Sequence, residues 1–247
     1  MRFKNKTAIV TGSSSGIGKA VALKLGTQGA NVCINFSQDK NLEKAKTIAL
    51  QIEKAGGKAI YVQADIGKVS EVKKMFDETL KHFNKLDILV NNAAYAFLKP
   101  ISEVTEEEYD YIFNINVKGL FFACQFAAKT MNEGGKIINI SSATTGLMLS
   151  GYGVYDATKG AVEIFSRILS KEMGPKNISV NVISPGATET EQFRRGKTDE
   201  FIAQLSAMSH FNRIAKTDEI AKVVSFFCSD DSSWVTGQNI RVNGGTC

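Results

Sequence analysis

The sequence predicts an α/β fold, a doubly wound sheet of seven parallel strands with helices on both faces. Two observations support this prediction. Short apolar segments alternate with longer helical patterns along the whole chain, and strands joined through helices pair in parallel by right-handed crossovers. Five positions also follow the ends of expected strands: Gly12, Asp65, Asn91, Ser142 and Pro185. Carboxyl ends of parallel strands meet at one edge of the sheet, so we expect a ligand crevice there.

Each expected element follows from its own pattern. Short runs rich in Val and Ile, bounded by turn residues, predict the strands Thr7–Val10, Asn31–Phe36, Ala59–Ala64, Leu86–Val90, Lys136–Ile140, Ser179–Ile183 and Asn239–Val242. Apolar residues at helical spacing predict the helices Gly18–Gln28, Leu42–Ala55, Ser70–Phe83, Glu106–Met131, Gly153–Met173 and Thr217–Cys228. No repeat or linker divides the chain, so residues 1–247 are expected to form a single domain.

Composition excludes several classes of protein. Hydrophobic residues make up 43% and charged residues 22% of the 247 positions, and the net charge is +5 without a block of like charges, so nucleic acid is not an expected partner. The N-terminus lacks the apolar core of a signal peptide and no apolar run is long enough to span a membrane, which predicts a cytoplasmic protein. Four scattered cysteines predict free thiols, and with two histidines they predict no metal site.

A glycine-rich turn follows the first expected strand. The strand runs into Gly12, Gly16 and Gly18, and an apolar helical pattern comes next. Glycine lets the backbone turn tightly and approach a pyrophosphate, and the N-terminus of the helix offers free N–H groups to phosphate. The spacing Gly-x-x-x-Gly-x-Gly therefore predicts a phosphate-binding loop.

A second pattern predicts acid–base chemistry. Tyr155 and Lys159 are four residues apart, so they share one face of a helix. An ammonium beside a phenol favours the phenolate and is expected to lower the tyrosine pKa, which would let Tyr155 exchange a proton with a carbonyl oxygen. Ser142, thirteen residues before Tyr155, is expected to hold that oxygen. Ser141 and Tyr152 are the competing candidates.

Taken together, these stretches resemble the classical short-chain dehydrogenase/reductase family. The resemblance runs from Thr11 through Asn243-Gly244-Gly245, essentially the whole chain. It implies a Rossmann-type domain that binds a nicotinamide dinucleotide, with Ser142, Tyr155 and Lys159 as catalytic residues. It also implies that Asn116 completes the catalytic set by holding a water that bridges toward Lys159. An asparagine that only kinks its helix is the alternative.

The resemblance further assigns cofactor contacts. Asp65 matches the family's contact to the adenine ring, and Pro185-Gly186-x-x-x-Thr190 matches the segment that contacts the nicotinamide. Asn91-Asn92-Ala93-Ala94 matches the stretch beside the cofactor, with Ala94 in place of the usual glycine. The expected cofactor-binding residues are Gly12, Ser14, Ser15, Gly16, Ile17, Gly18, Ser37, Asp65, Ile66, Asn92, Ala93, Tyr155, Lys159, Pro185, Gly186 and Thr190.

The end of the second expected strand bears on the choice between NAD(H) and NADP(H). A carboxylate there would bind the ribose of NAD and repel the 2′-phosphate of NADP. Neither Phe36 nor Ser37 is acidic, whereas Ser37 and Lys40 offer a donor and a charge to a phosphate. Ser15, where NADP-preferring relatives often carry a basic residue, and Asp39 argue the other way. The sequence favours NADP(H) and leaves NAD(H) open.

The segment 186–212 interrupts the alternation of strands and helices. It mixes charged residues with Phe193, Phe201, Met208 and Phe211. Long insertions in compact domains are often lids, and the resemblance implies that this one covers the substrate. The alternative is a helical excursion that only packs on the body of the protein.

The predicted activity is reduction of a ketone by NADPH, or the reverse reaction. The chain looks most similar to acyl-carrier-protein ketoreductases and hydroxynaphthalene-type reductases. An NAD-dependent alcohol, steroid or sugar dehydrogenase would share every catalytic residue, and a non-catalytic dinucleotide sensor is a third possibility. The family resemblance also implies a homotetramer, for which Tyr109–Met131, Gly153–Met173 and the C-terminal strand offer surfaces. The substrate itself is not determined by the sequence.

Overall fold

The computed structural model describes residues 1–247 and has one seven-stranded sheet. All strands are parallel, in the order β3-β2-β1-β4-β5-β6-β7, which confirms the predicted fold class. The strands are β1 (Thr7–Val10), β2 (Asn31–Phe36), β3 (Lys58–Gln63), β4 (Ile88–Asn91), β5 (Lys136–Ile140), β6 (Ser179–Pro185) and β7 (Asn239–Val242).

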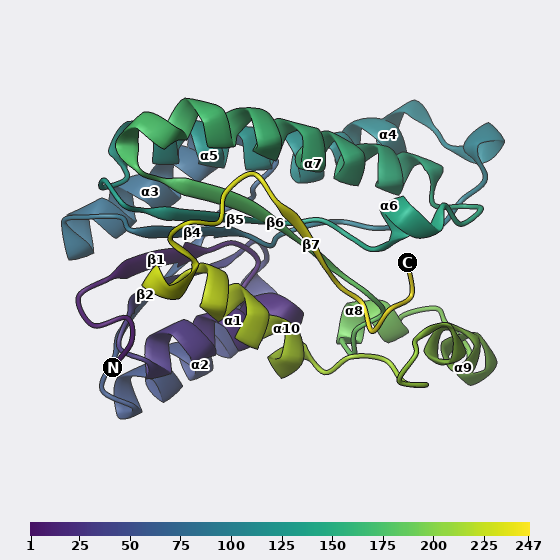
Figure 1. Cartoon of the computed structure of the whole chain (residues 1–247), viewed down its shortest axis with the longest axis horizontal. Coiled ribbons are helices and arrows are strands. Elements are labelled where there is room, and N and C mark those ends of the chain that lie inside the picture. Colours follow the sequence, from purple (N-terminus) through teal and green to yellow (C-terminus); the bar gives the residue numbers. More distant parts are fainter.

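Helices cover the two faces of the sheet in separate layers (Figure 1). The helices are α1 (Gly16–Thr27), α2 (Leu42–Lys54), α3 (Val69–Phe83), α4 (Glu106–Phe113), α5 (Leu120–Thr130), α6 (Thr144–Leu147), α7 (Gly153–Met173), α8 (Glu191–Arg194), α9 (Asp199–Met208) and α10 (Thr217–Phe227). Figure 1 shows α1, α2 and α10 on one face and α3, α5 and α7 on the other, while α8 and α9 lie beyond one end of the sheet. No helix combines the length and the apolar character needed to cross a membrane.

Two hydrophobic cores follow from the alternation of side chains along the strands. Ala8 and Val10 of β1 face the core under α1, α2 and α10, whereas Ile9 between them faces the core under α3, α5 and α7. Both faces of the central strands are therefore buried, which explains their continuous apolar sequences. The strand order reverses direction between β1 and β4, and a crevice opens at such a point beyond the strand ends.

The expected helix Glu106–Met131 is wrong in one respect, because it is interrupted. Residues Asn114–Gly119 form a π-helical segment between α4 and α5. The side chain of Asn116 bonds the backbone of Tyr95 in this segment. Gly119 is pressed against Ile66, where an added Cβ would lie 2.4 Å from the backbone oxygen. These tertiary contacts stabilise the π-helical segment. The apolar periodicity of the sequence does not reveal it.

Candidate active site

A single large cavity of about 1460 Å³ lies beyond the carboxyl ends of the strands. Its wall contains every expected site residue except Gly18 and Asn116, which lie directly behind it. The expected lid segment also lines the cavity, through side chains of α8, α9 and their flanking loops. The fold thus brings the glycine loop, the Ser142, Tyr155 and Lys159 side chains and the segment 186–212 to one place.

The glycine loop is held in a shape that only glycine tolerates. Gly12 and Gly16 have φ of +60° and +57°, in the left-handed region. A Cβ on Gly12 would lie 2.9 Å from the Cα of Ala93, and a Cβ on Gly18 would lie 2.5 Å from the Nδ2 of Asn92. The loop therefore packs directly on the strand end that carries Asn92 and Ala93.

Buried polar side chains that the sequence analysis missed fix this loop. Asn35 accepts a bond from the backbone N–H of Gly12 at 3.0 Å, and its own N–H donates to the hydroxyl of Ser13 at 3.0 Å. The hydroxyl of Thr11 accepts from the N–H groups of Asn92 and Ala93 at 2.9 and 3.0 Å. An asparagine inside the apolar strand β2 was the available sequence signal, because a buried polar residue needs a partner.

Tyr155 and Lys159 project from the same face of α7, as the spacing predicted. The ammonium nitrogen of Lys159 lies 5.7 Å from the centre of the Tyr155 ring and donates to the carbonyl oxygen of Ile140 at 2.8 Å. Burial lowers the pKa of Lys159 to about 8. The lysine is thus anchored on β5 rather than bonded to the phenol.

The expected lowering of the Tyr155 pKa is wrong. The residue keeps some exposure at the cavity wall, but the packing around its phenol group disfavours the charged form. Burial raises the pKa of Tyr155 to about 12, and a hydrogen bond with Ser142 offsets only part of this effect. Loss of solvation is thus the largest influence on Tyr155, and it favours the neutral phenol.

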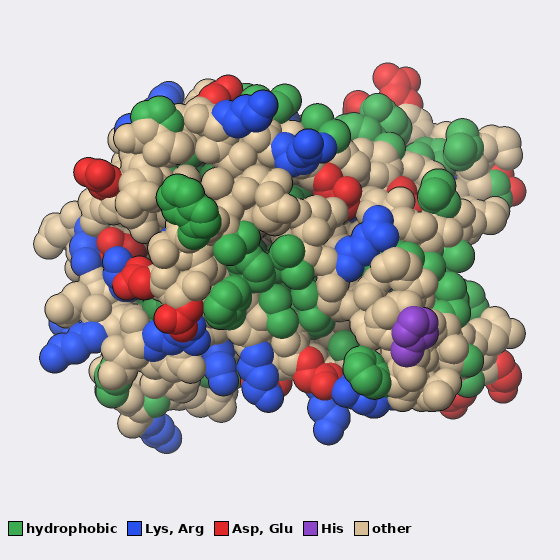
Figure 2. Space-filling model, viewed as in Figure 1, with side chains coloured by type: hydrophobic (Ala, Val, Ile, Leu, Met, Phe, Trp, Pro, Cys, Tyr) green, Lys and Arg blue, Asp and Glu red, His purple; other side chains and the backbone are tan.

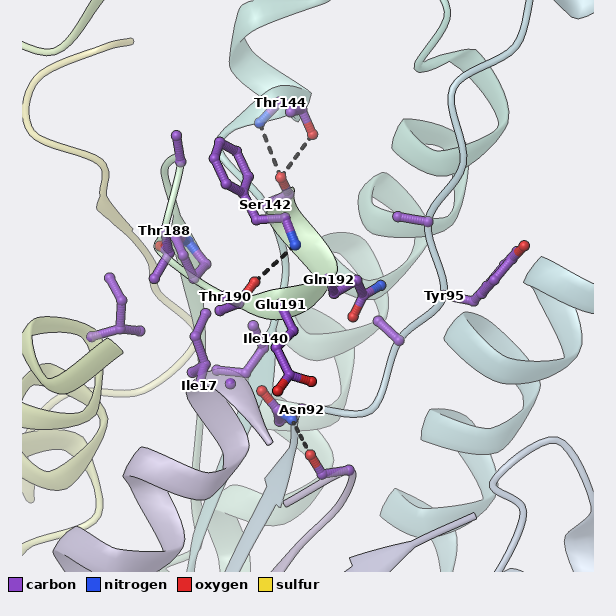
Figure 3. A pocket seen from close by; sticks show the side chains of 18 of the residues that line it. Ile17, Asn92, Tyr95, Ile140, Ser142, Thr144, Thr188, Thr190, Glu191 and Gln192 are labelled. Carbon is purple, nitrogen blue, oxygen red and sulfur yellow. Dashed lines mark hydrogen bonds between the residues drawn. The ribbon is translucent and has the colours of Figure 1, made fainter. Parts of the chain in front are cut away.

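The structure separates Ser142 from its competitor Ser141. The hydroxyl of Ser141 donates to the carboxylate of Glu163 at 2.7 Å, which fixes it toward α7. The hydroxyl oxygen of Ser142 accepts from the backbone N–H of Thr144 at 3.2 Å and lies 2.8 Å from the Thr144 hydroxyl (Figure 3). Ser142 is the serine that the structure pairs with Tyr155.

Asn116 holds structural bonds on three sides. Its side-chain oxygen accepts from the N–H of Tyr95 at 2.8 Å, and its amide donates to the Tyr95 oxygen at 2.9 Å and the Thr158 hydroxyl at 3.0 Å. Thr158 directly precedes Lys159, so Asn116 ties the Tyr95 loop to α7. The structural alternative for Asn116 is thus present, and the water relay remains a prediction.

The end of β2 presents donors and positive charge to the cavity. Ser37, Gln38, Lys40 and Lys44 line it, whereas Asp39 does not. The Asp39 carboxylate instead accepts from the amide of Gln63 at 2.6 Å, which turns it away from the cavity. Across the cavity, Lys44 pairs with Glu191 of α8 at 3.0 Å.

Asp65, the expected contact to adenine, lies in a small turn after β3. The Asp65 carboxylate accepts from the N–H of Gly67 at 2.9 Å, and the N–H of Asp65 donates to Glu71 at 2.7 Å. Ile66 lines the cavity beside it. No three His, Cys, Asp or Glu side chains cluster in a way that could hold a metal ion, and all four cysteines are free thiols.

Apolar and aromatic side chains make up much of the remaining cavity wall, and Arg195, Lys197 and Arg213 line it as well. Figure 3 shows Ser142 and Thr144 between the strand ends on one side and the Tyr95 loop on the other. Apolar side chains from that loop, from the α6–α7 region and from the segment 186–212 line the cavity: Tyr95, Phe97, Leu98, Leu147, Leu149, Tyr152, Phe193, Phe201, Leu205, Met208 and Phe211.

Comparisons with known proteins agree with this picture. A family model described as Enoyl-(Acyl carrier protein) reductase matches residues 12–247. An uncharacterized oxidoreductase of Methylorubrum extorquens is 42% identical, covering 99% of this chain and 98% of its own. A probable tetrahydroxynaphthalene reductase of Zymoseptoria tritici is 36% identical, with coverage of 100% and 96%. Among solved structures, the angucycline C-6 ketoreductase LanV with bound NADP is 38% identical, with a TM-score of 0.94 and coverage of 99% and 96%.

Proposed function

This chain belongs to the short-chain dehydrogenase/reductase family, and we propose that it transfers hydride between NADPH and a ketone, with the secondary alcohol as product. The observation that carries the proposal is the meeting of Ser142, Tyr155 and Lys159 with the glycine loop in one cavity. A protein that kept the nucleotide-binding loop but lacked these catalytic residues would instead fit a dinucleotide sensor. An NAD-dependent dehydrogenase remains the second candidate.

The loop residues fit a dinucleotide. Gly12 and Gly16 hold left-handed backbone that leaves the cavity side free of Cβ atoms, and α1 begins at Gly16 with its N-terminus toward the cavity. Free N–H groups at such a terminus bind phosphate. When bound, a nicotinamide dinucleotide supplies the hydride, because no side chain can do so. Asp65, Asn92 and Thr190 are proposed to hold its adenine and nicotinamide ends.

The proposed acid is Tyr155. Because burial raises its pKa to about 12, the phenol keeps its proton at neutral pH and can give it to a carbonyl oxygen. In the reverse reaction the same oxygen would take a proton from the alcohol. Ser142 binds the carbonyl oxygen. Lys159 is held in place by its bond to Ile140 and stabilises negative charge on the phenol oxygen.

NADPH is the proposed cofactor. The lining donors Ser37 and Gln38, with Lys40 and Lys44, suit a 2′-phosphate, and Asp39 is bonded to Gln63 away from the cavity. The argument that Asp39 raised against NADP is thereby weakened. The related ketoreductase LanV was solved with bound NADP, which supports the same choice.

The proposed substrate is a ketone on a fused-ring or aromatic scaffold. The Tyr and Phe side chains of the cavity wall support this proposal, because flat rings stack on such side chains. The names of two relatives, a probable tetrahydroxynaphthalene reductase and an angucycline ketoreductase, point the same way. The segment 186–212 is proposed to act as the lid that closes over such a substrate.

Self-association, as a homotetramer, is also part of the proposal. Of the apolar residues expected on the α5 surface, Phe121 is 42% exposed, whereas Leu120 is buried. Ile164 and Ile168 of α7 extend this surface with exposures of 58% and 54%. Figure 2 shows a second gathering of hydrophobic side chains over α10 and β7. Trp234, in the segment that joins these two elements, is 99% exposed. Apolar patches of this kind mark interaction surfaces.

The test is consumption of NADPH and NADH with a panel of carbonyl compounds: a polyhydroxylated naphthalene or quinone, a β-ketoacyl thioester, a steroid ketone and a simple sugar. Tyr155→Phe is measured beside the wild type, because it removes the proton and keeps the ring. We expect NADPH-dependent turnover of the aromatic ketone, reduced at least a hundredfold in the variant. Tight NADPH binding without any turnover would favour the sensor, and faster turnover with NADH would favour the second candidate.

A further inference from the structure

A chain of three side chains leads away from the catalytic serine. The hydroxyl oxygen of Thr144 lies 2.8 Å from the Ser142 hydroxyl and 2.5 Å from the carboxylate of Asp156. Asp156 directly follows Tyr155 on α7, and Thr144 begins α6. Neither Thr144 nor Asp156 belongs to the expected catalytic set. Asp156 forms no ion pair, so the Thr144 hydroxyl is the hydrogen-bond partner that the structure gives its carboxylate.

The number of hydrogens decides the direction of these bonds. A hydroxyl has one hydrogen, and an ionised carboxylate only accepts. When Asp156 is ionised, Thr144 must donate to it, so the contact with Ser142 is satisfied only if Ser142 donates to Thr144. When Asp156 is protonated, it donates to Thr144, and Thr144 donates to Ser142. In the second arrangement alone, the hydrogen of Ser142 points into the cavity, where it is donated to the Tyr155 phenol or, once a substrate is bound, to the substrate carbonyl.

We propose that Asp156, acting through Thr144, is a positioning residue that switches Ser142 between donating to Thr144 and donating to the substrate carbonyl. The inference rests on the proposed reductase function. The proton that Asp156 gains or loses is exchanged with solvent, and no covalent bond changes. The backbone N–H of Thr144 donates to Ser142 in both arrangements and keeps the serine oxygen in place.

The surroundings of Asp156 raise its pKa above the usual value for an aspartate. Burial, the largest cause, raises the Asp156 pKa, and the charge of Glu163 on the same helix adds to it, whereas the bond from Thr144 lowers it. Tyr152 and Tyr155 face the same carboxylate as neutral phenols, and its charge raises the pKa of both. Lys159, one turn further along α7, is bonded to Ile140, and Arg241 of β7 packs on Gly146 of α6.

The test is the pH dependence of kcat for ketone reduction with saturating NADPH, from the lowest pH at which the protein stays folded up to mildly alkaline pH. In the wild type, kcat is expected to fall about two- to tenfold as Asp156 ionises, the worth of one hydrogen bond to the carbonyl oxygen. The fall in kcat should disappear in both Thr144→Val and Asp156→Asn. The first variant lacks the hydroxyl that links Asp156 to Ser142, and the second has no carboxylate to ionise. Thr144→Ser should restore the fall in kcat, which loss of packing alone would not predict.

The controls separate this inference from the proposed function. Thr130→Val and Asp77→Asn remove the same groups far from the cavity and should keep the wild-type profile. NADPH binding and the unfolding temperature of each variant show whether it is folded, and Asp156→Asn tests the inference if Thr144→Val is not. A fall in kcat that persists in Thr144→Val or Asp156→Asn, or a wild-type profile without one, would overturn the inference. An inactive wild type would instead count against the proposed function.

Discussion

Lys159 follows Tyr155 by one helical turn, and its ammonium nitrogen lies 5.7 Å from the centre of the tyrosine ring. The lysine is 3% exposed and donates its bond to Ile140. Proximity along a helix thus places the charge beside the phenol, whereas burial decides how both groups titrate. A buried charge of this kind weakens folding.

Replacing Lys159 by Met should therefore abolish turnover and raise stability at neutral pH. Burial lowers the Lys159 pKa from 10.5 to about 8, which corresponds to a cost of roughly 3 kcal/mol below pH 8, partly offset by the bond to Ile140. Between pH 8 and about 10.5 the unfolded chain binds more protons at this site than the folded protein, so the wild type gains stability. The advantage of Lys159→Met should shrink over that range.

The measurement is chemical unfolding of wild type and Lys159→Met at pH 7 and at a pH near 10. Lys171→Met, an exposed lysine later in α7, is the matched control and should show no such pH dependence. A variant that is less stable than the wild type at pH 7 would contradict the assigned cost of burial.

Lys44 should contribute to the preference for NADPH. It lines the cavity beside Ser37 and Lys40 and pairs with Glu191 across it. Lys44→Ala should raise the KM for NADPH roughly tenfold and leave that for NADH unchanged, because only NADPH carries the phosphate. Glu191→Gln should lower the KM for NADPH by freeing Lys44. Neither change should alter stability by more than about 1 kcal/mol, since the pair is exposed.

Steady-state kinetics with both cofactors check this prediction. Lys46→Ala is the control, because Lys46 lies two residues away on α2 and pairs with Glu43 outside the cavity. An equal rise in KM for NADPH and NADH in Lys44→Ala would show that Lys44 does not bind the 2′-phosphate.

Gly18 should be intolerant of even one methyl group. A Cβ there would lie 2.5 Å from the Asn92 amide and 2.6 Å from the Gly12 oxygen. Gly18→Ala should cost about 1–3 kcal/mol and weaken NADPH binding, because the loop must move. Gly160→Ala is the matched control: it lies in α7 with no atom within 4 Å of an added Cβ, and it should gain up to about 1 kcal/mol. Urea unfolding and NADPH titration of both variants decide the point, and a neutral Gly18→Ala would contradict the tight packing.

The exposed surface of α5 and α7 should mediate self-association. Sedimentation velocity of the wild type should show an oligomer, and Ile168→Arg should yield a smaller species because a charge is placed among apolar side chains. Leu50→Arg changes a residue on α2 that is similarly exposed, at 56%, and should leave the mass unchanged. A monomeric wild type would exclude the proposed assembly. An intact oligomer in Ile168→Arg would show that this part of α7 is not in the contact between subunits.

Local patterns were enough to predict where the seven strands lie along the chain, their parallel direction and most of the helices. These signals involve residues that are close together in the sequence. They are the periodicity of the strands, the glycines of the first turn and the spacing of Tyr155 and Lys159. The glycine loop and Ser142 were predicted for the same reason, since each directly follows a strand. The sign of the Tyr155 shift could not be obtained this way, because burial depends on everything packed around the phenol.

Contacts between distant segments decided the rest. The π-helical turn at Asn116 depends on Tyr95 and Thr158, and the orientation of Asp39 depends on Gln63. The partners of Ser142 extend to Asp156, fourteen residues further on, through Thr144. The strands and the reactive residues can be identified from short stretches of sequence, because they follow from local geometry. The solvation and the hydrogen-bond partners of those residues depend on the folded chain, since both arise where remote segments pack together.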